Sequence, residues 1–156
     1  MIPYMGNLQG SSVDTGYPQD SEIPGRILAI DYGRRRIGVA LSDPMRIIAS
    51  PHGILSSRSP DELFSQICRL VRDLDVSKIV VGLPLGLQGE ESPMAKEVSE
   101  WGRRLKEKTG VEVCFLDESL STAEADRISR ALGSKQVPVD DIAASLNLRE
   151  YLEQLR

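Results

Sequence analysis

Short apolar runs and amphipathic stretches alternate along most of the chain. The short runs predict strands at Arg26–Gly33, Arg36–Ser42, Ile47–Leu55, Lys78–Leu83 and Val111–Leu116. Apolar residues at helical spacing predict helices at Pro60–Asp73, Ser92–Thr109, Thr122–Leu132 and Asp140–Leu155. The order β-β-β-α-β-α-β-α-α predicts an α/β fold whose mixed central sheet has about five strands, with helices on both faces.

The N-terminal segment differs from the rest of the chain. Residues 1–24 are rich in Gly, Ser, Pro and Asp, carry no Lys or Arg, and show no sustained apolar periodicity. This composition predicts a disordered leader without chemistry of its own. A single folded domain is expected over residues 25–156, because 156 residues is about the length of one domain.

Composition narrows the class of protein. Apolar residues make up 40% of the chain and charged residues 27%, as in ordinary soluble domains. No apolar run approaches the roughly 20 residues of a membrane helix, so we expect a cytoplasmic protein without membrane contact. Two cysteines and one histidine exclude a disulfide framework and a His-rich metal site. The net charge of −4 argues mildly against a protein that simply coats nucleic acid.

The first chemically unusual position is Asp31, which directly follows the apolar run Ile27–Ile30. An ionised carboxylate in a central strand costs on the order of several kcal/mol unless a cation or hydrogen bonds offset it. Asp is also common in turns, but the next strand resumes so soon, at Arg36, that the turn is expected after Asp31. Asp31 is therefore a candidate functional residue.

A second acidic position follows the last predicted strand. Asp117 and Glu118 lie at its carboxyl end, where open α/β sheets usually bind ligands. Strand alternation sends the two side chains to opposite faces, so only one of them is needed for catalysis. The plain alternative is that either acid caps the following segment, although Ser121 and Thr122 are better N-cap residues.

A third acidic position opens the last predicted helix. Asp140 and Asp141 begin it, and helix capping and the helix dipole alone would favour Asp there. The small residues Ala143 and Ala144 would let the helix approach another element closely. Such an approach would bring an N-terminal carboxylate near the sheet.

Taken together, these positions offer three carboxylates: Asp31, one of Asp117 and Glu118, and one of Asp140 and Asp141. Hard oxygen ligands without His or Cys select Mg²⁺ or Mn²⁺. Two such ions roughly 3.5–4 Å apart can activate a water and stabilise the leaving oxygen in phosphodiester hydrolysis. Because no histidine offers a credible base, the metal would have to generate the nucleophile.

Two further segments could contact a substrate. Arg34, Arg35 and Arg36 put positive charge in the first hairpin, where they could bind phosphates or simply form a solvated face. The glycine-rich segment Gly82–Gly89 follows the fourth predicted strand and could shape one wall of a site, although it is equally ordinary as a strand exit. Its candidate substrate-contacting residues are Gly82, Pro84 and Gly86.

Five motifs in the same order resemble the YqgF/RuvX family from about residue 26 to residue 155. They are Leu28–Gly33, Arg36–Asp43, Val81–Pro84, Asp117–Glu118 with Leu120–Thr122, and Val139–Asp140 with Ala143–Ala144. The resemblance implies an RNase H-like fold related to the RuvC resolvases. It also implies a nuclease that resolves Holliday junctions or trims the precursor of the small-subunit ribosomal RNA.

The resemblance assigns the metal-ligating and catalytic positions to Asp31, Glu118 and Asp140, with Asp141 adjacent to the last of them. It implies Mg²⁺ or Mn²⁺ as cofactor. The implied partners are structured RNA or branched DNA, and pre-ribosomal particles. Junction resolution would favour a homodimer, whereas an RNA-trimming enzyme could be a monomer.

Two departures from the family pattern remove positive charge near the substrate path. Ser119 stands where the family usually has Arg, and residues 133–139 form a short stretch whose only basic residue is Lys135. These departures favour, as an alternative, a non-catalytic module that binds nucleic acid or ribosomes. The first hairpin also looks like the phosphate-binding hairpin of actin-like ATPases, which are much longer proteins.

Overall fold

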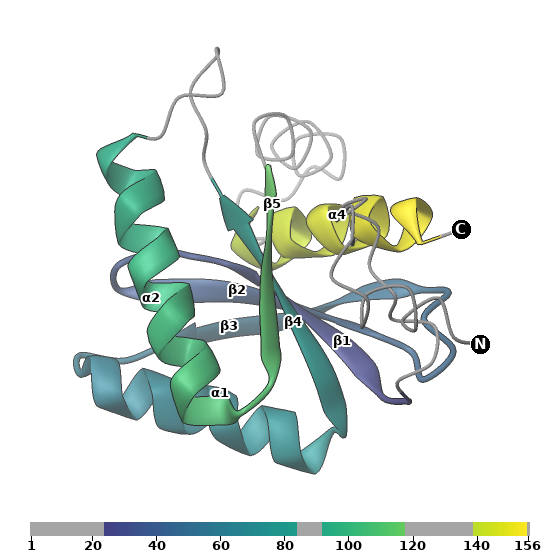
Figure 1. Cartoon of the computed structure of the whole chain (residues 1–156), viewed down its shortest axis with the longest axis horizontal. Helices are drawn as coiled ribbons and strands as arrows, with labels where there is room; N and C mark the ends of the chain where they lie inside the picture. The colour runs from purple at the N-terminus through teal and green to yellow at the C-terminus, as the bar shows by residue number, and fades with distance from the viewer. Residues whose placement is uncertain (1–23, 84–91, 118–138, 156) are drawn as a thin grey trace, which may run out of the picture.

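The computed structural model describes residues 24–83, 92–117 and 139–155. Within these ranges five strands form one sheet in the order β3-β2-β1-β4-β5 (Figure 1). The strands are β1 (Arg26–Asp31), β2 (Arg36–Ser42), β3 (Ala49–Ser56), β4 (Val76–Leu83) and β5 (Glu112–Asp117). The helices are α1 (Pro60–Asp73), α2 (Pro93–Thr109) and α4 (Val139–Gln154).

Strand β1 lies at the centre of this mixed sheet. It pairs antiparallel with β2 and parallel with β4, while β2 pairs antiparallel with β3 and β4 pairs parallel with β5. The carboxyl ends of β1, β4 and β5 therefore lie at the same edge of the sheet. The predicted α/β fold, with a mixed sheet of five strands, is confirmed.

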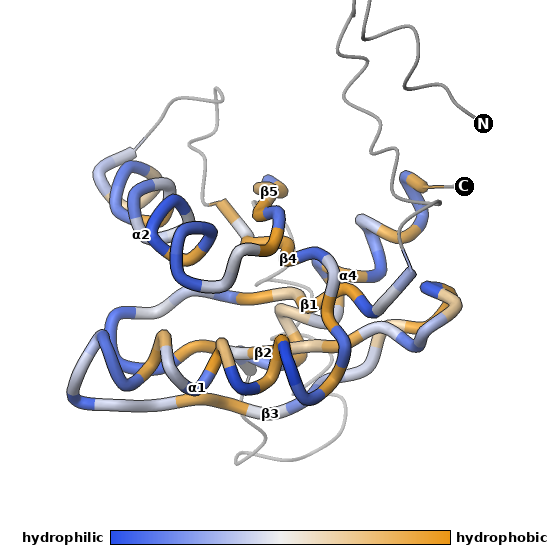
Figure 2. The backbone as a smooth tube through the Cα atoms, turned by 60° about the horizontal axis from the view of Figure 1, so that its bottom comes forward, coloured by the Kyte–Doolittle hydropathy of each residue, from blue (hydrophilic) through white to orange (hydrophobic). Residues whose placement is uncertain are grey.

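Helices cover both faces of the sheet, because successive side chains of each strand point to opposite sides. On one face, α1 and α2 pack against Leu28, Ile30 and their neighbours. On the other, α4 packs against Ile27 and Ala29. The central strands are mostly hydrophobic along their length, whereas α1 and α2 alternate between hydrophobic and hydrophilic residues (Figure 2).

Local capping explains why the helix bounds could be predicted closely. The Ser59 hydroxyl accepts a hydrogen bond from the backbone N–H of Glu62 at the start of α1. The Ser92 hydroxyl accepts from the N–H of Ala95 at 3.1 Å at the start of α2. Gly110 ends α2 in the left-handed conformation, with φ of 70°.

The third strand begins later than predicted. The strand was expected from Ile47, but the carboxylate of Asp43 accepts hydrogen bonds from the backbone N–H groups of Ile47 and Ile48 at 2.8 and 2.7 Å. These bonds hold the two isoleucines in the turn between β2 and β3, and β3 starts at Ala49. The strand is irregular, with a register shift between the pairs Val39–Gly53 and Ala40–Pro51.

Some predictions lie outside the described residues. These include the helix at Thr122–Leu132 and almost all of the leader at residues 1–24.

The last helix, expected at Asp140–Leu155, is present as Val139–Gln154. Strand β1 ends at Asp31, two residues before the predicted end, so the turn begins directly after the candidate carboxylate.

Candidate active site

Asp31 ends β1 on the face of the sheet that α4 covers. Ile27 and Ala29, which alternate with it along the strand, both belong to the cluster that packs against α4. Ile30 and Leu28 belong to the cluster on the opposite face. Asp31 is partly exposed, unlike the four strand residues before it, because it lies at the end of the strand.

Gly38 of β2 brings the start of α4 to this position. Gly38 is the register partner of Asp31. A Cβ atom on Gly38 would lie 2.0 Å from the carbonyl oxygen of Asp140 and 2.6 Å from the backbone nitrogen of Asp141. The Asp140–Asp141 peptide therefore rests directly on Gly38. Since paired residues on neighbouring strands share a face, the Asp31 side chain leaves the sheet beside this peptide.

The start of α4 carries carboxylate oxygens with incomplete hydrogen bonding. Within the described residues, Oδ2 of Asp140 and Oδ1 of Asp141 are buried and have no hydrogen-bond partner. Nε of Arg36 lies 2.7 Å from Oδ2 of Asp140, which makes an ion pair, but its N–H direction does not meet hydrogen-bond geometry. Buried carboxylate oxygens of this kind are suited to a cation.

Ala143 and Ala144 contribute to the close approach of α4, as the sequence suggested. Both are buried, and Ala144 packs in the cluster between α4 and the sheet. The tightest contact, however, is at Gly38, which the sequence analysis did not single out. A glycine opposite a candidate acidic residue in a hairpin was the signal that could have identified it.

The last residues of β5 alternate between the two faces of the sheet. Phe115 points toward α2, because its ring would contact a Cβ on Gly102. Asp117 alternates with Phe115 along β5, so its side chain belongs to the α2 face, opposite that of Asp31. Leu116 belongs to the α4 face. Glu118, the predicted catalytic residue, lies outside the described residues.

The three arginines of the first hairpin have different environments. Arg34 forms a two-pronged contact with the carboxylate of Glu97 on α2, with Nε–Oε1 and Nη2–Oε2 distances of 3.0 and 2.8 Å. Arg36 pairs with Asp140. Arg35 has no hydrogen bond or ion pair within the part of the chain that the structure describes. Of the three, Arg35 is therefore the one most available to an anion.

Glu97 links the hairpin to α2, and sequence analysis did not predict this role. Its carboxylate also accepts a hydrogen bond from the Tyr32 hydroxyl at 2.8 Å. The bond from Arg34 is the main cause of a lowered pKa for Glu97. Burial, reinforced by the bond to Glu97, raises the pKa of Tyr32 to about 12. Tyr32 thus remains protonated and Glu97 ionised at neutral pH, which keeps the turn fixed.

The glycine-rich segment is only partly described. Gly82 is buried in β4, next to Val81, the register partner of Ile30. It alternates with Val80, which belongs to the α4 cluster, so it lies on the same face as Asp31. Pro84 and Gly86, the other candidate substrate-contacting residues, lie outside the described residues.

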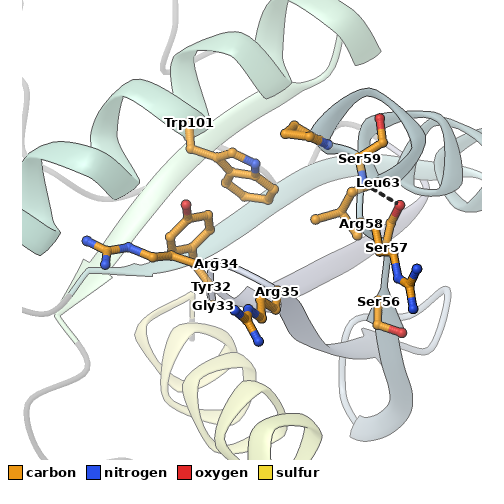
Figure 3. A pocket seen from close by; sticks show the side chains of 11 residues that line it. Tyr32, Gly33, Arg34, Arg35, Ser56, Ser57, Arg58, Ser59, Leu63 and Trp101 are labelled. Carbon is orange, nitrogen blue, oxygen red and sulfur yellow. Dashed lines mark hydrogen bonds between the residues drawn. The ribbon is translucent and has the colours of Figure 1, made fainter.

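A cleft lies on the other face of the sheet. It has a volume of about 750 Å³ and is lined by the β1–β2 turn, the segment between β3 and α1, and α2 (Figure 3). Its residues include Tyr32, Arg35, Arg58 and Trp101. Trp101 itself is 7% exposed.

No group of three or more His, Cys, Asp or Glu side chains that could hold a metal lies within residues 24–83, 92–117 and 139–155. Glu118, the third predicted ligand, lies outside these ranges. In the same ranges, no helix combines the length and apolarity required to span a membrane.

Relatives with known names match most of the chain. A protein of Roseiflexus sp. (strain RS-1), named "Putative pre-16S rRNA nuclease", is 38% identical over 140 residues, covering 87% of this chain and 99% of the relative. A protein of the same name from Chloroflexus aurantiacus is 40% identical over 134 residues, covering 83% and 88%.

Solved structures share the fold at lower identity. RuvC of T. thermophilus, in complex with a Holliday junction substrate, superposes with a TM-score of 0.54 at 15% identity and covers 81% of this chain and 93% of that protein. The Fowlpox virus resolvase, in complex with Holliday junction DNA, gives 0.50 at 17% identity, covering 83% and 98%. These likenesses confirm the expected RNase H-like architecture.

A family model provides the direct assignment. The model for RuvX, described as Holliday junction resolvase, matches residues 25–154. This range contains the hairpin with Asp31, the glycine-rich segment, the acidic end of β5 and the start of α4. On this match and on relatives that are 38–40% identical over most of both chains, the protein belongs to the RuvX family.

Proposed function

We propose that this chain is a divalent-metal-dependent nuclease that hydrolyses a phosphodiester bond in structured nucleic acid. The observation that carries the proposal is the contact of the Asp140–Asp141 peptide with Gly38, opposite Asp31. Through it, residues more than a hundred positions apart in the chain contribute carboxylates to one edge of the sheet. This is the edge where the parallel strands β1, β4 and β5 end.

The residues present are suited to a divalent cation. The unsatisfied oxygens at the start of α4 are hard ligands, and so is the carboxylate of Asp31. Carboxylates without His or Cys favour Mg²⁺ or Mn²⁺ over zinc or copper. When bound, such an ion activates water and neutralises charge on a phosphate. We assign Asp31, Glu118 and Asp140 as its ligands.

Alternation along β5 supports Glu118 rather than Asp117 as the ligand from that strand. Asp117 belongs to the face of α2, away from Asp31. Continuing the alternation by one residue assigns Glu118 to the face of Asp31 and Gly82. The proposed site therefore takes the second acid of the pair, as the family resemblance also implies.

Asp140 is favoured over its neighbour because it already has a cationic partner. The guanidinium of Arg36 lies against Oδ2 of Asp140, so the surroundings of this carboxylate already accommodate a positive charge. Asp141 also has an unsatisfied oxygen and is the alternative. Exchanging each for Asn separates them: Asp140→Asn is expected to lose more cleavage activity than Asp141→Asn.

The chain's other residues would bind and orient the substrate. Arg35 is available for a phosphate, and Arg36 is next to the proposed metal ligands. Arg34 fixes the turn through Glu97. We propose that the segment beginning at Gly82, with Pro84 and Gly86, forms one wall of the site.

The relatives' names support RNA as the substrate, specifically the 16S ribosomal RNA precursor. We propose its 5′ end as the part that is trimmed. The family description supports branched DNA as the second candidate. We also propose a cytoplasmic protein whose nuclease domain spans residues 25–156, and which works on pre-ribosomal particles.

Cleavage of two labelled substrates tests the proposal. A fragment of 16S rRNA precursor and a four-way DNA junction are incubated with the protein and Mn²⁺, or with chelator. We expect metal-dependent cleavage of the RNA that falls at least about a hundredfold in Asp31→Asn. Loss of a residue that only orients a metal ligand costs about 10- to 100-fold, and loss of the ligand itself should cost more. Asp73→Asn, an exposed acid at the end of α1, is the matched control and should retain activity.

The outcomes separate the candidate functions. Preferential cutting of the junction would move the assignment to Holliday junction resolution. If a folded protein cuts neither substrate with Mn²⁺, the nuclease is contradicted, and the departure at Ser119 then favours a non-catalytic binding module.

A further inference from the structure

The cleft beneath the first hairpin faces away from the proposed metal ligands. Asp31 and Tyr32 are adjacent in the chain, and their side chains belong to opposite faces of the sheet. Tyr32 packs against the cluster formed with α1 and α2 and lines the cleft. The Cα atoms of these two consecutive residues are about 3.8 Å apart. The cleft and the Asp31 carboxylate therefore lie on either side of the start of the same turn.

The cleft is positively charged. Its lining includes Arg34, Arg35 and Arg58 and no acidic residue. Arg34 is neutralised by Glu97, but Arg35 and Arg58 have no hydrogen bond or ion pair within the described residues. Among the serines that line the cleft, Ser57 donates a hydrogen bond from its hydroxyl to the carboxylate of Glu62. Two uncompensated guanidinium groups therefore remain for an anion.

The same cleft has an aromatic and apolar side. Figure 3 shows Tyr32 and Trp101 along one side, with Leu63 and Arg58 along the other. Tyr32 and Trp101 contact each other with ring centroids 5.0 Å apart and planes tilted by 52°. The reverse side of Trp101 is supported by Phe64, whose ring is stacked 5.7 Å away. These rings are held in place without a ligand.

We propose that this cleft binds an unpaired nucleotide of the nucleic-acid substrate, with Arg35 and Arg58 on its phosphates and the base against Tyr32 and Trp101. The inference rests on the proposed function and extends it to substrate recognition. A volume of about 750 Å³ lies within the range of about 300–1,000 Å³ typical of small-ligand sites. It combines cationic and aromatic contacts, as single-strand sites do.

A base must be unpaired to enter such a cleft. In an A-form duplex the bases are stacked and the major groove is too narrow for side chains to read. The cleft would therefore select a substrate with a single-stranded segment next to the bond that is cut. A strand that crosses the β1–β2 turn would reach both the cleft and the carboxylates.

The chain provides its own reporter for this test, because Trp101 is its only tryptophan. Full-length Asp31→Asn protein in chelator is titrated with a short single-stranded oligoribonucleotide, the corresponding duplex, adenosine monophosphate and inorganic phosphate. Intrinsic fluorescence is followed in each case. We expect saturable quenching by the single strand, with affinity at least about tenfold above that for the duplex and the two small ligands.

Charge-removing variants locate the site. Arg35→Ala/Arg58→Ala should weaken single-strand binding about tenfold. It should also lower the slope of log affinity against log salt by about 1.4, since each phosphate contact on a single strand contributes about 0.7. The matched control is Arg72→Ala/Arg103→Ala, which removes two exposed arginines outside the cleft. Circular dichroism and thermal melting verify that both double variants are folded.

Distinct results would overturn the proposal. Equal quenching by duplex and single strand, or by the mononucleotide or phosphate alone, would exclude selection of an unpaired nucleotide in a strand. Equal binding by the two double variants would place the strand elsewhere. These titrations need no metal, so they are independent of the cleavage assay. A protein that cleaves but shows no change in Trp101 fluorescence contradicts only the proposed nucleotide binding in the cleft. A protein whose fluorescence responds but that never cleaves contradicts only the proposed nuclease activity.

Discussion

A bound divalent cation would compete with Arg36 for the carboxylate of Asp140. Its guanidinium lies 2.7 Å from Oδ2 of Asp140, yet its side chain is 62% exposed, and that of Asp140 is 26% exposed. Exposed ion pairs are worth about 0.2–1 kcal/mol. The pair is therefore weak enough for a divalent cation to displace, while it reduces repulsion among the carboxylates in the absence of metal.

Removing the Arg36 side chain would end this competition. Arg36→Ala should bind Mn²⁺ about two- to fivefold more tightly than the wild type, because the ion no longer displaces a pair worth up to about 1 kcal/mol. Isothermal titration calorimetry measures the affinity. Arg35→Ala removes the same charge one residue earlier and should change the affinity less. Equal effects of the two variants would mean that Arg36 acts only through general electrostatics.

At the residue scale, the sequence indicated which acidic positions come together better than it indicated the partners of the arginines. Asp31 stood out because a charge beside an apolar run is costly, and the Asp140–Asp141 pair because small residues follow it at the start of a helix. The structure brings these positions together. Arg34 stays a candidate phosphate contact, and the structure adds a partner for it, the carboxylate of Glu97. That pairing joins a turn to a helix 63 positions away, and no local pattern indicates it.

At the element scale, packing of α4 on β2 depends on a missing side chain. The carbonyl of Asp140 occupies the space that a Cβ on Gly38 would need. Gly38 is not among the described residues with positive φ, so its requirement is one of space. Gly110 shows the opposite case, with φ of 70° and open space around its missing Cβ.

These two glycines form a matched pair for mutation. Gly38→Ala should destabilise the protein by about 3 kcal/mol and reduce cleavage, since α4 must move away from β2 and carry Asp140 with it. Gly110→Ala should cost only about 1 kcal/mol, for the left-handed conformation, and leave cleavage unchanged. Urea unfolding gives both values. A Gly38→Ala protein as stable and active as Gly110→Ala would refute the close packing.

The turn between β2 and β3 is predicted to be sensitive to acid. Backbone N–H groups, above all that of Ile48, donate to Asp43 and hold the pKa of its carboxyl below the usual value. A lowered native pKa means that the carboxylate stabilises the fold above the unfolded-state pKa of about 3.9, and that this contribution is lost as the pH falls through the native value.

Asp43→Asn isolates this contribution. The variant should be less stable than the wild type by about 1 kcal/mol at pH 7, because bonds to a charged acceptor are replaced by weaker ones. The difference should shrink as the pH is lowered below about 4, where the wild-type carboxylate also becomes protonated. Unfolding free energies at several pH values measure it. A difference independent of pH would show that the charge of Asp43 is not involved.

Element bounds were predictable where the determinants are local. Ser59 and Ser92 cap helices whose starts follow from neighbouring residues. The strand expected from Ile47 begins at Ala49 instead, because one carboxylate, that of Asp43, draws the two isoleucines into the turn. Their apolar side chains suggested a strand, but both are exposed in the structure.

At the scale of the whole molecule, the sheet separates two tasks. The face under α4 carries Asp31 and the start of α4, where we propose metal binding. The face under α1 and α2 carries the cationic, aromatic cleft, where we propose binding of an unpaired nucleotide. The β1–β2 hairpin connects them, since consecutive residues at the end of β1 point to opposite sides.

The fold could be predicted from element order and family motifs, because both are properties of the chain read in sequence. The cleft could not, since it combines three distant segments, and its residues follow ordinary turn, capping and core patterns. Trp101 illustrates this: its helical spacing indicates burial, and it is buried, but spacing does not reveal that its remaining edge lines a cleft.

The most direct measurement compares the two acids at the end of β5. Mn²⁺ affinity and metal-dependent cleavage of the ribosomal RNA precursor are measured for the wild type, Glu118→Gln and Asp117→Asn, which each remove one charge at neighbouring positions. We expect Glu118→Gln to lose metal binding and at least about a hundredfold in cleavage, and Asp117→Asn to retain both. Loss of metal binding and cleavage in Asp117→Asn but not in Glu118→Gln would contradict the proposed site on the α4 face.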